Sequence, residues 1–170
     1  KEALSTLKLG QPLVGDNAGL KGQFYSMYGD VYYKLNSIDS SFYYYDEALK
    51  INDKNLGVLN NYAYYLSLEG RDLGKAEQMS SKTVELEPTN STYLDTYAWI
   101  LFKRGRFFEA KFIIERALDN GGSTNGVIIE HYGDILYFNN DIEGAVNQWK
   151  RASLLETEDV ELLKRKIEAQ

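Results

Sequence analysis

The stretch EHYGDILYFNNDIEGAVNQWKRA, residues 130–152, decides the fold of this chain. It contains the only histidine, four acidic residues and a tryptophan, so its composition alone would suit an active site. However, the tyrosine–small residue pair that ends at Gly133 has counterparts that end at Gly29, Ala63 and Ala98. These four small residues are 34, 35 and 35 positions apart. A constant period of this length indicates a repeat, so we interpret residues 130–152 as one repeating unit.

Two further series of small residues have the same period and support the repeat independently. The first series is Ser41, Ala76, Ala110 and Ala145, and the second is Ala48, Thr83, Ala117 and Ala152. Small residues are needed where two helices cross closely, because a larger side chain would hold the helix axes apart.

Each unit has the hydrophobic spacing of two helices. Apolar residues at i, i+3, i+4 and i+7 mark the first helix of the third unit: Leu94, Tyr97, Ala98 and Leu101. A similar stripe marks its second helix: Ala110, Phe112, Ile113, Ala117 and Leu118. A short polar turn separates the two helices, and residues that end or cap helices follow the second one. The pattern predicts an all-α protein of antiparallel helix pairs.

A helix–turn–helix unit of this length, with these small and aromatic positions, resembles the tetratricopeptide repeat (TPR). The resemblance implies a right-handed α–α superhelix, or solenoid, and it covers most of the chain. We expect a single array over residues 1–170. Its parts are the tail of a preceding repeat and a linker (1–21), four repeats (22–55, 56–90, 91–124 and 126–159) and a capping helix (160–170). Tyr45 and Trp149 occupy the position of the large aromatic of the family's second helix, whereas Ser80 departs from it. We expect Trp149 to be a packing residue.

Composition narrows the functional classes. The net charge of -6 and the pI of about 4.9 argue against nucleic-acid binding, which uses clustered Lys and Arg. The absence of cysteine removes Cys-based zinc sites and Cys nucleophiles. No apolar run approaches the roughly 18 residues of a membrane span. We therefore expect no cofactor, no nucleic-acid partner and no membrane insertion by this segment.

The polar residues of the opening stretch do not form a catalytic set. His131 has no identifiable nucleophile or orienting partner, and we expect it at a helix flank. Glu130 and Asp134 share a helix face, but two carboxylates alone define neither an acid–base site nor a metal site. We expect them to form a solvated or partner-facing acidic face. No catalytic, cofactor-binding or metal-binding residue is assigned, and the chain is not expected to be an enzyme.

The resemblance implies that the first helices line a concave face. Ten residues are predicted to face that groove by their helical spacing from the small positions: Asp30, Tyr33, Asn60, Tyr64, Asp95, Trp99, Phe102, Glu130, Asp134 and Tyr137. Exposed aromatics are typical interface anchors, and the acidic residues beside them favour a protein or peptide partner of apolar and basic character. The alternative is that these rings lean into neighbouring helices and are buried.

Some TPR proteins hold the C-terminal carboxylate of chaperones in a clamp of Lys, Arg and Asn. Asn61 and Lys103 match parts of that clamp in this sequence. Ser26, Asp30 and Trp99 occupy its other positions, and Asp30 would repel a carboxylate. We therefore do not expect a receptor for chaperone tails.

The near-consensus repeats resemble those of bacterial TPR proteins, several of which are exported or membrane-attached. A location in the bacterial periplasm or at a membrane is one expectation, and any targeting signal would lie outside these residues. The resemblance implies a non-catalytic protein–protein interaction scaffold that binds a peptide or protein segment in its groove. Two alternatives stay open: a C-terminal regulatory or assembly module of a larger multi-domain enzyme or secretion or envelope component, and a self-associating module that forms homo-oligomers.

Overall fold

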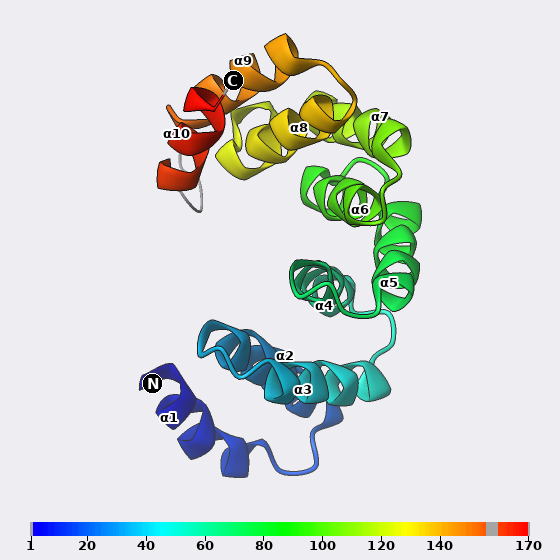
Figure 1. Cartoon of the computed structure of the whole chain (residues 1–170). Coiled ribbons are helices and arrows are strands. Elements are labelled where there is room, and N and C mark those ends of the chain that lie inside the picture. The colour runs from blue at the N-terminus through cyan, green and yellow to red at the C-terminus, as the bar shows by residue number, and fades with distance from the viewer. Residues whose placement is uncertain (1, 156–159, 170) are drawn as a thin grey trace. The chain divides into compact units, whose positions relative to one another are not determined.

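The computed structural model describes residues 2–155 and 160–169, and these residues form α-helices and short 3-10 helices (Figure 1). The helices in chain order are α1 Glu2–Gly10, η1 Gln11–Val14, α2 Ala18–Lys34, α3 Ile38–Ile51, α4 Leu56–Leu68, α5 Leu73–Leu86, α6 Ser91–Lys103, α7 Phe107–Asp119, η2 Gly122–Thr124, α8 Gly126–Phe138, α9 Ile142–Ala152 and α10 Val160–Glu168. Over the described residues the prediction of an all-α protein is confirmed. None of the described helices is long and apolar enough to cross a membrane.

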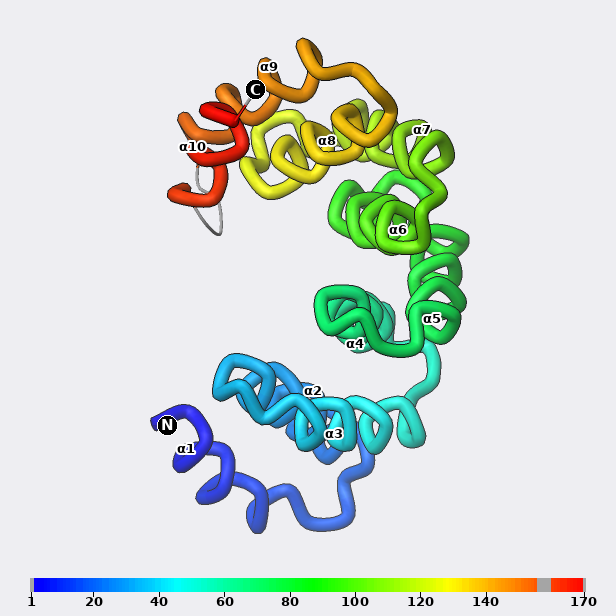
Figure 2. The backbone as a smooth tube through the Cα atoms, in the orientation of Figure 1, coloured from blue at the N-terminus to red at the C-terminus, as the bar shows by residue number. Residues whose placement is uncertain are grey.

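The chain divides into two compact units, Lys1–Tyr65 and Leu66–Gln170. In the first unit α2 and α3 form a helix pair, and in the second unit α6 pairs with α7 and α8 with α9. Turns of three residues join the helices of these pairs, so the partners run antiparallel, and the backbone trace follows each reversal (Figure 2). The predicted antiparallel helix pairs are therefore observed.

The same turn closes each first helix, and it explains the polar residues between the helices. Asn36, Gly70, Gly105 and Asn140 have φ of 58°, 63°, 75° and 64°, which only Gly and Asn adopt readily. One residue later a backbone N–H donates back to the last turn of the helix, as Asp141 does to the carbonyl of Leu136 at 3.0 Å. This is the Schellman arrangement, which satisfies carbonyls that the helix end would otherwise leave unpaired.

Asparagine also starts the first helices. The side-chain oxygen of Asn90 accepts hydrogen bonds from the backbone of Thr92 at 3.1 Å and of Tyr93 at 3.3 Å. Asn17, Asn55 and Asn125 accept in the same way at the other first helices. An N-cap of this kind satisfies N–H groups that have no partner within the helix. The cap and the Schellman turn together determine where each first helix begins and ends.

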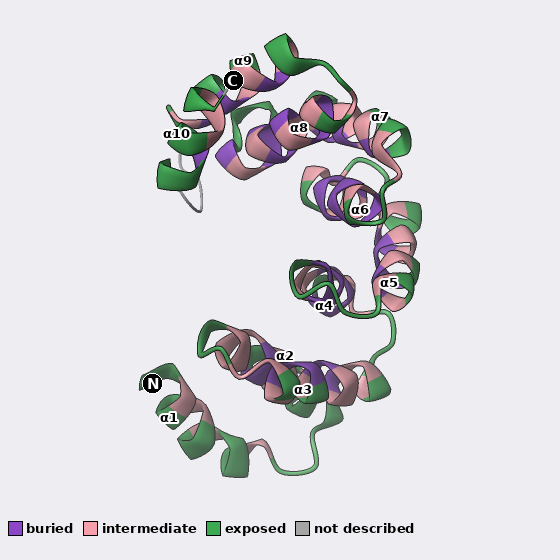
Figure 3. Ribbon diagram, in the orientation of Figure 1, coloured by how far each residue is buried: buried purple, intermediate pink, exposed green. Residues whose placement is uncertain are grey.

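The buried residues gather between the helices of each pair (Figure 3). In α2–α3 the ring of Tyr45 lies directly over Gly29, and a Cβ at Gly29 would be 2.6 Å from Cε1 of that ring. In α8–α9 Trp149 lies over Gly133 in the same way. Trp149 is only 3% exposed, so its prediction as a packing residue is confirmed.

The helix α10 lies against the last helix pair. Leu163 is completely buried there, in a cluster with Ile129, Leu136, Ala145 and Trp149. Ile167, one turn further along α10, packs against the same cluster. Val160 and Leu162 stay exposed, so Leu163 and Ile167 supply the apolar contact of α10 with the cluster.

Candidate functional site

The ten side chains predicted to face a groove are less accessible than expected. Asn60, Asp95 and Trp99 are buried, and the other seven are half-buried. Six of the ten lie in the second unit, on α6 and α8. The contacts within each unit explain the low exposure.

In the first unit the carboxylate of Asp30 is already engaged. It accepts hydrogen bonds from the Tyr45 hydroxyl and from Nδ2 of Asn61, the latter at 3.2 Å. Burial and the hydrogen bond to Asp30 raise the pKa of Tyr45 well above its ordinary value. Asn61, one of the two residues that match the carboxylate clamp, is therefore already hydrogen-bonded to a carboxylate of this chain.

The tyrosines of the first unit also contact one another. The ring of Tyr33 stacks on that of Tyr65 with centroids 3.6 Å apart. Tyr64 packs against Tyr65 at 6.0 Å. These rings are packed against one another and are half-buried.

In the second unit Trp99 is a packing residue and not an exposed anchor. It is 9% exposed, and its ring stacks on that of His131 with centroids 4.0 Å apart. Phe102 stacks on its indole at 4.9 Å, and Nζ of Lys103 lies 5.6 Å from the ring centroid. For Trp99 the expectation of an accessible groove residue is wrong, because adjacent first helices are close enough for their aromatic rings to stack.

His131 does not lie at a helix flank, and it does have an orienting partner. It is buried, and its Nδ1 lies 2.9 Å from Oδ1 of Asp95. Burial lowers the pKa of His131, but Asp95, Asp134 and Glu130 outweigh this effect, so that its pKa is raised. The two partners are 36 residues apart, one more than the repeat period, so the pair joins equivalent helices. The pair is a tertiary contact that joins α6 and α8.

Glu130 and Asp134 do not form a free acidic face. Both carboxylates accept hydrogen bonds from Nζ of Lys166 on α10, at 2.9 and 2.8 Å. Asp134 also accepts from Nε1 of Trp149 at 2.9 Å, and the Lys166 ammonium lies 5.9 Å from the Trp149 ring centroid. We call the surface formed by Glu130, Asp134 and Trp149 the acidic seat. Sequence reasoning missed Lys166, although its separation of 36 residues from Glu130 repeats that of His131 from Asp95.

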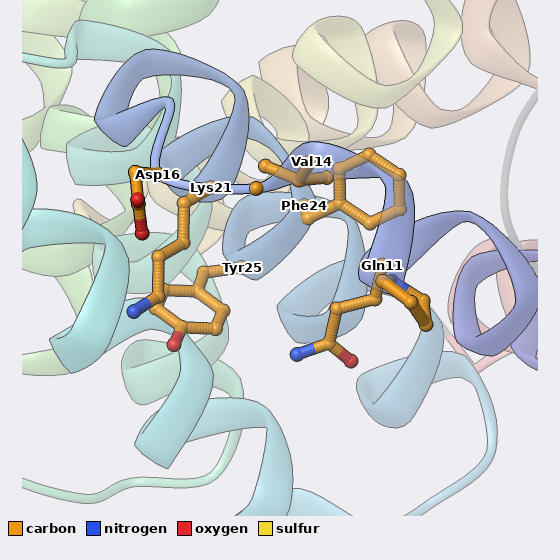
Figure 4. A pocket seen from close by; sticks show the side chains of 8 residues that line it. Gln11, Val14, Asp16, Lys21, Phe24 and Tyr25 are labelled. Atoms are coloured by element: carbon orange, nitrogen blue, oxygen red, sulfur yellow. The ribbon is translucent and has the colours of Figure 1, made fainter.

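A hollow of about 440 Å³ in the first unit was not anticipated from the sequence. It lies between η1 and the start of α2 and is lined by Gln11, Pro12, Val14, Gly15, Asp16, Lys21, Phe24 and Tyr25. Figure 4 shows the Lys21 side chain beside the Tyr25 ring, and its ammonium is 5.7 Å from the ring centroid. Asp16 and Lys21 are both exposed, so the hollow is an open depression with little to desolvate a ligand.

Helix α7, which follows α6 in its helix pair, carries two exposed phenylalanines. Phe108 is 80% exposed and Phe112 is 62% exposed, and both line a hollow of about 210 Å³ beside Tyr97 and Ile113. The expectation that Phe112 belongs to the buried stripe is wrong. Ala110, Ile114 and Ala117 form the buried side of α7, so Phe112 lies on its outer side.

Comparisons with known proteins agree with this architecture. No protein-family profile matches the chain. Stress-induced-phosphoprotein 1 of Caenorhabditis elegans is 31% identical over 121 residues, which are 68% of this chain and 35% of that protein. The chain thus spans about a third of the length of that relative.

Solved structures of similar fold have much lower sequence identity. MamA AMB-1 superposes with a TM-score of 0.66 at 19% identity, over 89% of this chain and 93% of its own. An O-GlcNAc transferase mutant of Thermobaculum terrenum gives a TM-score of 0.72 at 13% identity, over 81% of this chain and 26% of its own. These structures have TPR-type helical repeats. By its fold and by its period of 34 to 35 residues, the chain is built of helical repeats of the tetratricopeptide type.

Proposed function

We propose that this chain is a non-catalytic protein-interaction scaffold that binds a peptide or protein segment of apolar and basic character on its first helices. In this proposal the four repeats are 22–55, 56–90, 91–124 and 126–159. The observation that carries it is the acidic seat, where two carboxylates and an indole of one helix pair bind a lysine from another helix. A surface that recognises a basic helix of its own chain has the chemistry to recognise a similar segment of a partner.

The fold supports this role because tandem helix pairs present long, continuous surfaces to extended partners. The carboxylates that remain half-buried favour a cationic group, and the half-buried rings beside them favour an apolar one. A fully exposed aromatic groove is not required, since interface anchors become desolvated only when the partner arrives.

The test should use first-helix side chains that lie outside the fully buried core. Tyr64 and Tyr137 are half-buried first-helix residues, whereas Trp99 belongs to the packing and is unsuitable. Phe108 and Phe112 supply a matched control, because they are more exposed aromatics on a second helix.

The experiment compares three forms of the chain in affinity capture from an extract of the source organism: wild type, Tyr64→Ala/Tyr137→Ala and Phe108→Ala/Phe112→Ala. Far-UV circular dichroism first establishes that all three are equally helical. The proposal expects a captured protein that the first-helix variant loses at least tenfold and the second-helix variant retains. Loss with the second-helix variant alone would move the binding surface to α7 and overturn the proposal.

A further inference from the structure

The contact between α10 and the acidic seat repeats a contact that occurs inside the array. Asp95 on α6 pairs with His131 on α8, and Glu130 on α8 pairs with Lys166 on α10. In both cases the cation lies 36 residues after the carboxylate, so Lys166 takes toward Glu130 the sequence position that His131 takes toward Asp95. The helix α10, which packs on α9, therefore supplies the acidic seat with a cation at the position where a further first helix would supply one.

Two groups of different character hold α10 in that place. Leu163 is fully buried among Ile129, Leu136 and Trp149, which supplies the apolar part of the contact. Lys166, three residues and thus about one helical turn later, supplies the charged part through Glu130 and Asp134. Recognition is thereby specified as an apolar residue followed after three positions by a cation.

Few side-chain contacts keep α10 in place. It has nine residues, and an isolated helix of that length is marginal in water, so its stability comes from its contacts. Leu163 is its only buried residue, and Lys164 and Arg165 are exposed. A competing helix would need to replace the buried Leu163, the packing of Ile167 and the two hydrogen-bonded ion pairs of Lys166.

We propose that the acidic seat of α8–α9 binds a basic amphipathic helix of a partner protein, and that α10 occupies this seat as a built-in competitor. The partner helix carries Leu, Ile or Met at one position and Lys or Arg three positions later. The proposal deepens the function proposed above and rests on it, since it names the kind of partner and the part of the surface that receives it. The charge of the seat favours a cation, and the observed seating of Lys166 shows that the geometry accommodates one.

The experiment uses the full chain and a labelled peptide of residues 160–169, held helical by a staple between the exposed positions 161 and 165. Binding is followed by fluorescence anisotropy. The wild-type chain is compared with Leu163→Asp/Lys166→Glu, which removes both groups that seat α10. Lys164→Ala is the matched control, because Lys164 is exposed and pairs with Glu161 of its own helix.

The Leu163→Asp/Lys166→Glu variant, called the unseated chain below, should bind the peptide at least tenfold more tightly than wild type or Lys164→Ala. In those two chains the tethered α10 competes with the peptide at a high effective concentration. A peptide with Lys166→Glu should bind the unseated chain at least tenfold more weakly than the unchanged peptide. Equal affinity of wild type and the unseated chain, or equal affinity of the two peptides, would overturn the proposal. If the double variant loses helix content, Lys166→Glu alone keeps Leu163 and serves in its place.

Light scattering decides whether the occupant is a second copy of this chain. A wild-type dimer that Lys166→Glu converts to a monomer would identify the α10 of another copy as the occupant and overturn the assignment to a partner protein. A monomer at all concentrations supports the assignment. The scaffold function is judged separately, because capture that depends on Tyr64 and Tyr137 can persist when the peptide fails to bind.

Discussion

Replacement of Gly29 by alanine should destabilise the first unit, although alanine is the better helix former. In an exposed helix interior the change from Gly to Ala gains about 1 kcal/mol. At Gly29 the added methyl would lie 2.6 Å from Cε1 and 2.7 Å from Cδ1 of Tyr45, which is fully buried. Overpacking of this kind costs about 1–3 kcal/mol. Displacing the ring also breaks the hydrogen bond from the Tyr45 hydroxyl to Asp30, worth about 1.5–3 kcal/mol.

The net expectation is a loss of roughly 1.5–5 kcal/mol of unfolding free energy for Gly29→Ala, after the gain in helix propensity is subtracted. Gly22→Ala in the same helix is the matched control. Its methyl would meet Ile51 at 3.4 Å, which is ordinary van der Waals contact, so this change should be neutral or stabilising. Urea unfolding followed by circular dichroism measures both, and hydrogen exchange in α2 and α3 locates the effect.

A double-mutant cycle tests the cause of the loss. The third repeat has Ala98 where the first has Gly29, and Ile114 where the first has Tyr45, and both residues are buried in one cluster. In a Tyr45→Ile background Gly29→Ala should therefore no longer destabilise, giving a coupling energy of at least about 1.5 kcal/mol. If Gly29→Ala costs the same in both backgrounds, or if it stabilises the wild type as Gly22→Ala does, the packing argument is refuted.

Three further outcomes follow from individual contacts. The pKa of His131 is raised beside Asp95, so its stabilising charge is fully present below the ordinary histidine pKa of about 6.5 and is lost as pH rises through the folded-state pKa. The difference in urea midpoint between wild type and His131→Gln should therefore shrink toward high pH, and a constant difference would contradict this. Trp149→Phe removes the hydrogen bond to Asp134 and should lower the free energy of unfolding by about 1.5–3 kcal/mol, and an unchanged urea midpoint would show that the bond contributes nothing. Asn90→Ala should cost about 1 kcal/mol and speed amide exchange in the first turn of α6, whereas unchanged protection there would exclude a capping role.

The accessible surface was the part of the molecule that sequence reasoning described least well. Helical spacing placed Trp99 and Asp95 on the correct helix and turned them away from their own second helix. It could not show that the ring of His131 covers Trp99, because that contact depends on how closely α6 and α8 approach. The same limit applies to Phe112, which shares a helix with the buried stripe but lies outside it.

The sequence by itself determined the helices, their pairing and their ends. The period of small residues, the glycine or asparagine at each turn and the asparagine caps act within one or two helices, and their effects can be worked out from local geometry. The tertiary structure alone decided which polar groups are free. Asp30, Asp95 and Glu130 are all carboxylates on first helices, yet each is bound by a different partner: Tyr45 with Asn61, His131, and Lys166. These partners lie 15 to 36 residues away, and only the packing of whole helices brings their atoms within hydrogen-bonding distance.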